Sequence, residues 1–182
     1  DGPEISVECV LRDGECTPLI VARKVLGEGP RMAFEEVGHD VDANDPLLTD
    51  PRMAETLQRA HAAAGFTNGY THIEFKLTRD AMHVIEINAR LGGGMIPYLG
   101  LLTSGVDASL AAADVVAGRT PTIEFPGPLR AASIRFAYPP YDMEITSATA
   151  RTDLVRPPVH EVRLGTQPGA RVRRPPYGLA RC

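Results

Sequence analysis

Residues 69–94 read Gly-Tyr-Thr-His-Ile-Glu-Phe-Lys-Leu-Thr-Arg-Asp-Ala-Met-His-Val-Ile-Glu-Ile-Asn-Ala-Arg-Leu-Gly-Gly-Gly, and their pattern is the most informative in the chain. Two β-forming runs, 69–77 and 82–89, flank a short polar turn at 78–80, which is the pattern of a β-hairpin. Side chains on a strand alternate between two faces. Each run is therefore expected to be apolar on one face and to carry specific polar groups on the other.

The polar faces of the two runs hold the chemically informative side chains. The second run places four side chains on one face: Val84, Glu86, Asn88 and Arg90. The first run places Glu74 on its polar face. A three-residue loop at 79–81 would put Glu74 directly opposite Glu86, whereas a two-residue loop would leave them one step out of register. The pairing of these two carboxylates is therefore a prediction.

Facing carboxylates destabilise a sheet, and a bound cation reverses that effect. Carboxylate, amide and phosphate oxygens are the ligands that Mg²⁺ prefers, so we predict a Mg²⁺ site, which would also suit Mn²⁺, at Glu74, Glu86 and Asn88. Arg90 has a planar fork suited to a phosphate or carboxylate, and the glycines at 92–94 allow backbone N–H groups to approach an anion. The alternative is a solvated face with Arg90 in an ordinary salt bridge. A solvated face, however, gives no reason for Asn88 and Arg90 to follow Glu86 at every second position and to be followed by three glycines.

The rest of the chain predicts an α+β fold with an antiparallel sheet. Asp50 and Gly65 are suitable residues to start and stop a helix between them. A turn is expected at Asp13-Gly14. The expected strands are 5–11, 17–25, 32–37, 131–138 and 159–164; the expected helices are 51–64, 97–102 and 107–116; 40–50 is expected to be a loop and 121–128 a linker.

The chain has three cysteines, Cys9, Cys16 and Cys182. With the first hairpin turning at 13–14, Leu11 faces Cys16 and Cys9 faces Pro18, so Cys9 and Cys16 are diagonal neighbours and poorly placed for a disulfide. No Cys-x-x-Cys motif is present, so zinc is not expected. These features favour a reducing, cytoplasmic location with free thiols.

Composition limits the classes of partner. The net charge is −4 and the pI about 5.7, so there is no basic excess to follow a nucleic-acid backbone. No apolar run approaches the roughly 20 residues of a membrane helix. Because of this charge and the absence of a long apolar run, we expect neither nucleic acid nor membrane as a partner.

A start at Asp1 rather than Met suggests a cut or processed chain.

Glu86-Ile-Asn-Ala-Arg90 resembles the Glu-x-Asn-x-Arg signature of the ATP-grasp superfamily. Residues 69–74 resemble the strand that carries the other metal-binding glutamate of that superfamily. Residues 1–8 are similar to the stretch after its hinge, where the residue matching Glu4 approaches the nucleotide ribose. The resemblance implies an ATP site on this chain in which Glu4, Glu74, Glu86 and Asn88 take part.

Residues 34–39 resemble the substrate-side segment of the L-amino-acid ligase branch. The resemblance implies that Glu36 and His39 contact the substrate or the phosphoryl intermediate, and that Gly93 and Gly94 border the acyl pocket. Lys24 lies on a strand where the family often has a basic residue, although a solvated lysine explains it equally well.

The resemblance implies an ATP-grasp C-terminal subdomain at 1–120, followed by a small β-rich subdomain at 121–182, with the upstream half of the clamp before Asp1. The expected reaction is formation of an amide from a carboxylate and an amine, both small molecules, through an acyl phosphate that Arg90 steadies. A homodimer is left open. Two alternatives stand: a carboxylase of the biotin-carboxylase or carbamoyl-phosphate type, and a non-catalytic nucleotide-binding module.

Overall fold

The computed structural model describes residues 2–29, 32 and 34–175. The chain forms two compact units, one containing residues 1–25 and 38–134, the other containing 26–37 and 135–182. The dividing points fall within strands, so these units do not follow the boundary expected after residue 120. The boundary after residue 120 stays a prediction about which parts of the chain would fold independently.

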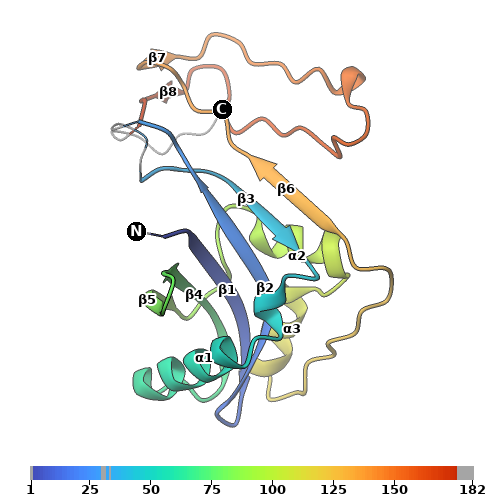
Figure 1. Ribbon diagram of the computed structural model, residues 1–182. Helices are drawn as coiled ribbons and strands as arrows, with labels where there is room; N and C mark the ends of the chain where they lie inside the picture. Colours follow the sequence, from blue (N-terminus) through green and yellow to red (C-terminus); the bar gives the residue numbers. More distant parts are fainter. Residues whose placement is uncertain (1, 30–31, 33, 176–182) are drawn as a thin grey trace. The chain divides into compact units, whose positions relative to one another are not determined.

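A six-stranded sheet with the order β5-β4-β1-β2-β3-β6 organises the fold (Figure 1). Its strands are β1 (Glu4–Arg12), β2 (Glu15–Leu26), β3 (Glu36–Asp42), β4 (Gly69–Leu77), β5 (Met82–Asn88) and β6 (Ala131–Arg135). The β1–β2, β1–β4 and β4–β5 pairs are antiparallel. The expected α+β class with an antiparallel sheet is confirmed.

The first hairpin turns where the sequence predicts. Asp13 and Gly14 have φ angles of 50° and 85°, the left-handed conformations that a tight turn between strands requires. Cys9 pairs with Pro18 and Leu11 pairs with Cys16, as predicted. A register shift between Glu8 and Cys9 marks a bulge in this ladder.

Helix α1 (Pro51–Ala64) begins and ends at its predicted caps. It starts where the Asp50 side chain accepts a hydrogen bond from Arg52 N and ends at Gly65, with φ 75°. Helices α2 (Ile96–Ser104) and α3 (Ala108–Val116) and the short 3₁₀ helix η1 (Pro46–Leu48) complete the first unit. Among the described residues no single helix has the length and apolar content to cross a membrane; only α2 and α3 taken together, bent by 107°, pass that test.

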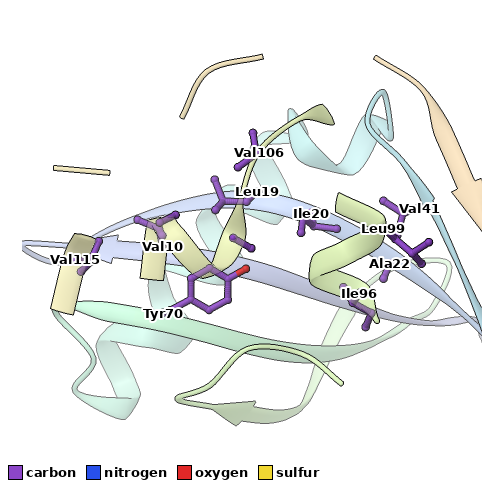
Figure 2. Close-up of a cluster of buried hydrophobic side chains, with 12 residues drawn as sticks. Val10, Leu19, Ile20, Ala22, Val41, Tyr70, Ile96, Leu99, Val106 and Val115 are labelled. Atoms are coloured by element: carbon purple, nitrogen blue, oxygen red, sulfur yellow. The ribbon is translucent and has the colours of Figure 1, made fainter. Parts of the chain in front are cut away.

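Apolar side chains cover the two faces of the sheet in separate clusters. Ile5, Val7 and Phe75 pack on one face with residues of α1. The other face holds Val10, Tyr70, and residues of α2 and α3 (Figure 2). Because strand residues alternate, the positions that continue this second face beyond Val10 and Tyr70 are the polar residues of β1 and β4. That polar half of the sheet is where the candidate site lies.

Two expectations about strands were wrong. Strand β3 spans Glu36–Asp42, not 32–37, because ladder pairing within the sheet rather than local propensity fixes its position. The strand expected at 159–164 is not formed; Pro157 and Pro158 precede it and cannot donate to a ladder. Between β6 and residue 175, the described residues form only the pair β7 (Met143–Glu144) and β8 (Arg171–Val172) and the 3₁₀ helix η2 (Thr152–Leu154).

Candidate functional site

Glu74 on β4 lies directly opposite Glu86 on β5. The turn between the strands is the tight one, closed by a 2.8 Å hydrogen bond from Thr78 N to Ala81 O. That turn alone would leave the carboxylates out of register. The register shifts after Phe75, which pairs with Val84, so Ile85 is the extra residue that brings the two glutamates together.

This bulge also corrects one detail of the predicted face. Val84 pairs with Phe75, and paired residues point to the same side of a sheet. Val84 therefore lies on the face of Phe75, and the expectation that it shares a face with Glu86 was wrong. Glu86 and Asn88 lie beyond the bulge, where Asn88 pairs with His72.

The Glu74 carboxylate is held by two bases. Its Oε2 lies 2.5 Å from Lys24 Nζ, and its Oε1 lies 3.1 Å from His72 Nε2. The hydrogen bonds from His72 and Lys24 lower the pKa of Glu74 to about 2, against the opposing effect of burial. Burial also opposes the charge on His72, but hydrogen bonds to Glu74 and Glu8 raise its pKa to about 9. A charged network thus fixes the Glu74 side chain.

Lys24 is part of this network and not a solvated surface lysine. Its side chain is only 5% exposed, and its Nζ lies 4.0 Å from Glu4 Oε2 as well as beside Glu74. Glu4 in turn lies 2.9 Å from Lys76 Nζ. The alternative of an ordinary solvated lysine was therefore wrong, and the structure brings Glu4, Lys24 and Glu74 together.

Glu8 is a member of the site that the sequence reasoning missed. The residue is fully buried, its Oε1 lies 2.5 Å from His72 Nδ1, and its Oε2 accepts a 3.0 Å hydrogen bond from Gly92 N. A Cβ atom at Gly92 would collide with the Glu8 carboxylate and the His72 ring. Glu8 therefore connects the glycine loop to the strands. Its signal in the sequence was an acid between two apolar residues, Val7 and Cys9, in the middle of a strand.

The exposed part of the site is formed by the end of β5 and the loop after it. Asn88 Nδ2 donates a 2.7 Å hydrogen bond to Glu86 Oε1. Arg90 is exposed and its NH1 donates to Leu91 O at 3.0 Å. Of the glycines expected at a substrate pocket, Gly94 has φ 58°, and Gly93 is exposed, its carbonyl accepting from the backbone N–H that starts α2.

The two remaining candidates lie on β3. His39 is buried, with 1% of its surface exposed, and shares a face with Val41, which belongs to the cluster of Val10 and Tyr70. Strands β1 and β2 separate it from β4, and strands lie about 4.8 Å apart, so His39 is about 14 Å from that strand. It is therefore not part of the Glu74 cluster. Glu36 belongs to the second unit, where its carbonyl accepts a 2.9 Å hydrogen bond from the Tyr138 hydroxyl.

The residues present fit a divalent cation and an anionic ligand. Glu74, Glu86 and Asn88 offer hard oxygen ligands from adjacent strands, and the Lys24 ammonium group beside Glu74 shows that this position attracts a cation. Ser6 pairs with Glu74 across β1 and β4. Its hydroxyl is buried and has no hydrogen-bond partner among the described residues, which is unusual unless a ligand or solvent completes the site.

Comparison with known proteins places this geometry in a family. Residues 1–136 match the family model described as "ATP-grasp in the biosynthetic pathway with Ter operon". Over 125 residues the chain is 30% identical to carnosine synthase 1 of Homo sapiens, covering 68% of this chain and 15% of that protein.

Solved structures show the same fold. The L-amino acid ligase of Bacillus licheniformis superposes with a TM-score of 0.73 and 22% identity, over 100% of this chain and 45% of that one. A phosphoribosylglycinamide synthetase of Anaerococcus prevotii superposes with a TM-score of 0.68 and 15% identity, over 94% of this chain and 44% of that one. The chain thus spans less than half of each of these three proteins. The family match covers most of the chain, and the chain belongs to the ATP-grasp family of ATP-dependent ligases.

Proposed function

We propose that this chain carries the metal side of the active site of an ATP-dependent carboxylate–amine ligase that uses amino-acid substrates. The observation that carries the proposal is the pair Glu74 and Glu86, facing each other across β4 and β5 beside Asn88. The names of two similar proteins, a carnosine synthase and an L-amino acid ligase, support amino acids as substrates.

Glu74, Glu86 and Asn88 would hold Mg²⁺, which when bound neutralises charge on the phosphate groups of ATP. Glu4 would accept hydrogen bonds from the nucleotide ribose, as the resemblance of residues 1–8 to the ATP-grasp superfamily implies. Lys24, now paired with Glu74, carries a positive charge that can be shared with a phosphate oxygen once a metal ion takes over that carboxylate.

The proposed reaction has two steps. A substrate carboxylate oxygen attacks the γ-phosphorus of ATP, the bond to the β-phosphate oxygen breaks, and an acyl phosphate and ADP result. The amine of the second substrate then attacks the acyl carbon, phosphate leaves, and the amine loses a proton, which gives the amide. Arg90 would hold the acyl phosphate through two parallel N–H bonds.

Four further residues would serve the organic substrates. Gly93 and Gly94 would border the acyl side chain, since neither fills the space beside it with a side chain of its own. Glu36 would pair with the ammonium group of an amino acid, and His39 would contact the substrate or the phosphoryl intermediate. These roles come from the resemblance of 34–39 and 86–94 to the ligase branch.

The test uses the intact enzyme that contains this chain and measures ADP release with a panel of amino-acid pairs and with bicarbonate. Glu86→Gln should abolish release, because a neutral amide cannot replace a carboxylate ligand. Glu55→Gln, an exposed glutamate on α1, is the matched control and should keep wild-type rates. Release stimulated by bicarbonate alone would favour a carboxylase, and Mg-ATP binding by calorimetry without turnover would favour a non-catalytic module.

A further inference from the structure

A second cluster of metal-ligating side chains lies on the opposite face of the sheet. It consists of Cys9 on β1, Cys16 on β2 and His61 on α1. The two sulfur atoms and one ring nitrogen all lie within 4.8 Å of one another. Cys9 and Cys16 pack in the cluster of α1 and not in that of α2 and α3, so this group is separate from Glu74 and Glu86.

The fold builds this cluster from residues distant in sequence. The hairpin register makes Cys9 and Cys16 diagonal neighbours, with Cys9 at the bulge. Helix α1 buries Met53, Leu57 and His61 at intervals of four residues, which puts His61 on the face that meets the sheet. No local motif shows this arrangement, which is why the absence of Cys-x-x-Cys gave no hint of it.

The proton positions on His61 suit a metal ligand. Its Nδ1 lies 2.7 Å from Leu57 O, and a carbonyl can only accept, so in the neutral ring Nδ1 carries the proton. Nε2 then accepts a 2.7 Å hydrogen bond from the Thr71 hydroxyl, which a bound metal ion would replace, and a ring nitrogen of His61 lies within 4.8 Å of the Cys16 sulfur. A metal-ligating histidine usually donates its other N–H to a carbonyl or carboxylate in this way.

The two sulfur atoms are arranged to share a ligand more readily than to bond to each other. Both cysteines are free, and their sulfur atoms lie within 4.8 Å of each other. The diagonal position is poor for a disulfide. In a tetrahedral zinc site, however, Zn–S of about 2.3 Å and Zn–N of about 2.0 Å hold the ligand atoms about 3.5–3.8 Å apart. Because the present separations are 4.8 Å or less, they require a contraction of about 1.3 Å at most.

We propose that Cys9, Cys16 and His61 bind one borderline or soft metal ion of the Zn²⁺ class, with Thr71 bordering the fourth position. Binding converts both thiols to thiolates and releases two protons, so that Zn²⁺ and two S–H groups give two Zn–S bonds and two H⁺. Cys9 and His61 are fully buried, whereas Cys16 is partly exposed, so the ion enters past Cys16. Thiolate and imidazole ligands select this class of metal over the Mg²⁺ that suits carboxylates.

The experiment titrates the intact, metal-free enzyme with Co²⁺ in a non-thiol reductant and then displaces the Co²⁺ with Zn²⁺. Thiolate-bound Co²⁺ gives a ligand-to-metal charge-transfer band that carboxylate-bound Co²⁺ does not, so the Glu74 site cannot imitate the signal. We expect one equivalent with this band, at least tenfold weaker binding in Cys16→Ser, and unchanged binding in the controls Cys182→Ser and His83→Gln.

Two results would overturn the proposal. One is a wild-type titration without the thiolate band, which needs no variant and so does not depend on whether a variant folds. The other is equal affinity in the wild type and in Cys16→Ser that keeps its ATP turnover. Either would leave two neighbouring free cysteines, one buried and one partly exposed, beside a histidine.

Discussion

Glu74 faces Glu86 although the turn between their strands is one residue too short for that register, because the bulge at Ile85 supplies the missing residue. Like charges directly opposite each other destabilise a sheet. In the structure Glu74 is compensated by Lys24 and His72. The pair is thus kept in a geometry that is favourable only when positive charge is nearby, and this gives the first prediction.

Lys24→Met should destabilise the metal-free protein by about 3 kcal/mol, because removing one partner of a buried ion pair leaves the other charge uncompensated. Urea unfolding measures the effect, and added Mg²⁺ should restore part of the loss by binding the released Glu74. The control is Lys76→Met, whose side chain is 40% exposed and should lose about 1 kcal/mol or less. Equal losses in the two variants would contradict this account of Lys24.

Gly92→Ala should lower both stability and ATP turnover, because the added methyl group collides with the Glu8 carboxylate and the His72 ring. We expect a loss of about 1–3 kcal/mol, the usual range for overpacking a filled site, measured by thermal or urea unfolding. Gly93→Ala is the matched control for stability, since a Cβ there meets nothing within 4 Å. A Gly92→Ala protein as stable as Gly93→Ala would show that the loop can move away from Glu8.

The stability of the metal-free protein should pass through a plateau in mildly acidic solution. The pKa of His72 is raised from 6.5 to about 9, so its contribution is complete below pH 6.5 and is lost as the pH rises through 9. The pKa of Glu74 is lowered from 4.5 to about 2, so its contribution is complete above pH 4.5 and is lost as the pH falls toward 2.

Unfolding free energies measured across the pH range test this profile. His72→Gln should flatten the decline between pH 6.5 and 9, since a glutamine does not titrate. If the variant loses as much unfolding free energy between pH 6.5 and 9 as the wild type does, groups other than His72 cause that loss.

Arg90→Lys should reduce ATP turnover at least tenfold while leaving stability within about 0.5 kcal/mol, as for most exposed positions. Lysine keeps the charge but lacks the planar fork that holds two oxygens, and Arg90 is exposed in the structure. ADP release and the melting temperature are the two measurements. Arg79→Lys, in the exposed turn before β5, should change neither, and wild-type turnover in Arg90→Lys would exclude a bidentate role.

Elements whose signals lie within a few residues could be predicted from the amino-acid sequence alone. Helix α1 and strand β4 have their predicted bounds, because a capping aspartate, a left-handed glycine and an alternating pattern act locally. The signature from Glu86 to Arg90 likewise identified the family before any contact was known. The facing of Glu74 and Glu86 was within reach of the sequence, but only as one of two registers.

Features that depend on pairing between distant segments became visible only in the folded chain. The bulge at Ile85 selected the register, the ladder fixed β3 at Glu36–Asp42, and Glu8 met Gly92 across 84 residues. Cys9 and Cys16 met His61 in the same way. Strand register and side-chain contacts arise from packing that closes long loops, and no short window of sequence contains both partners.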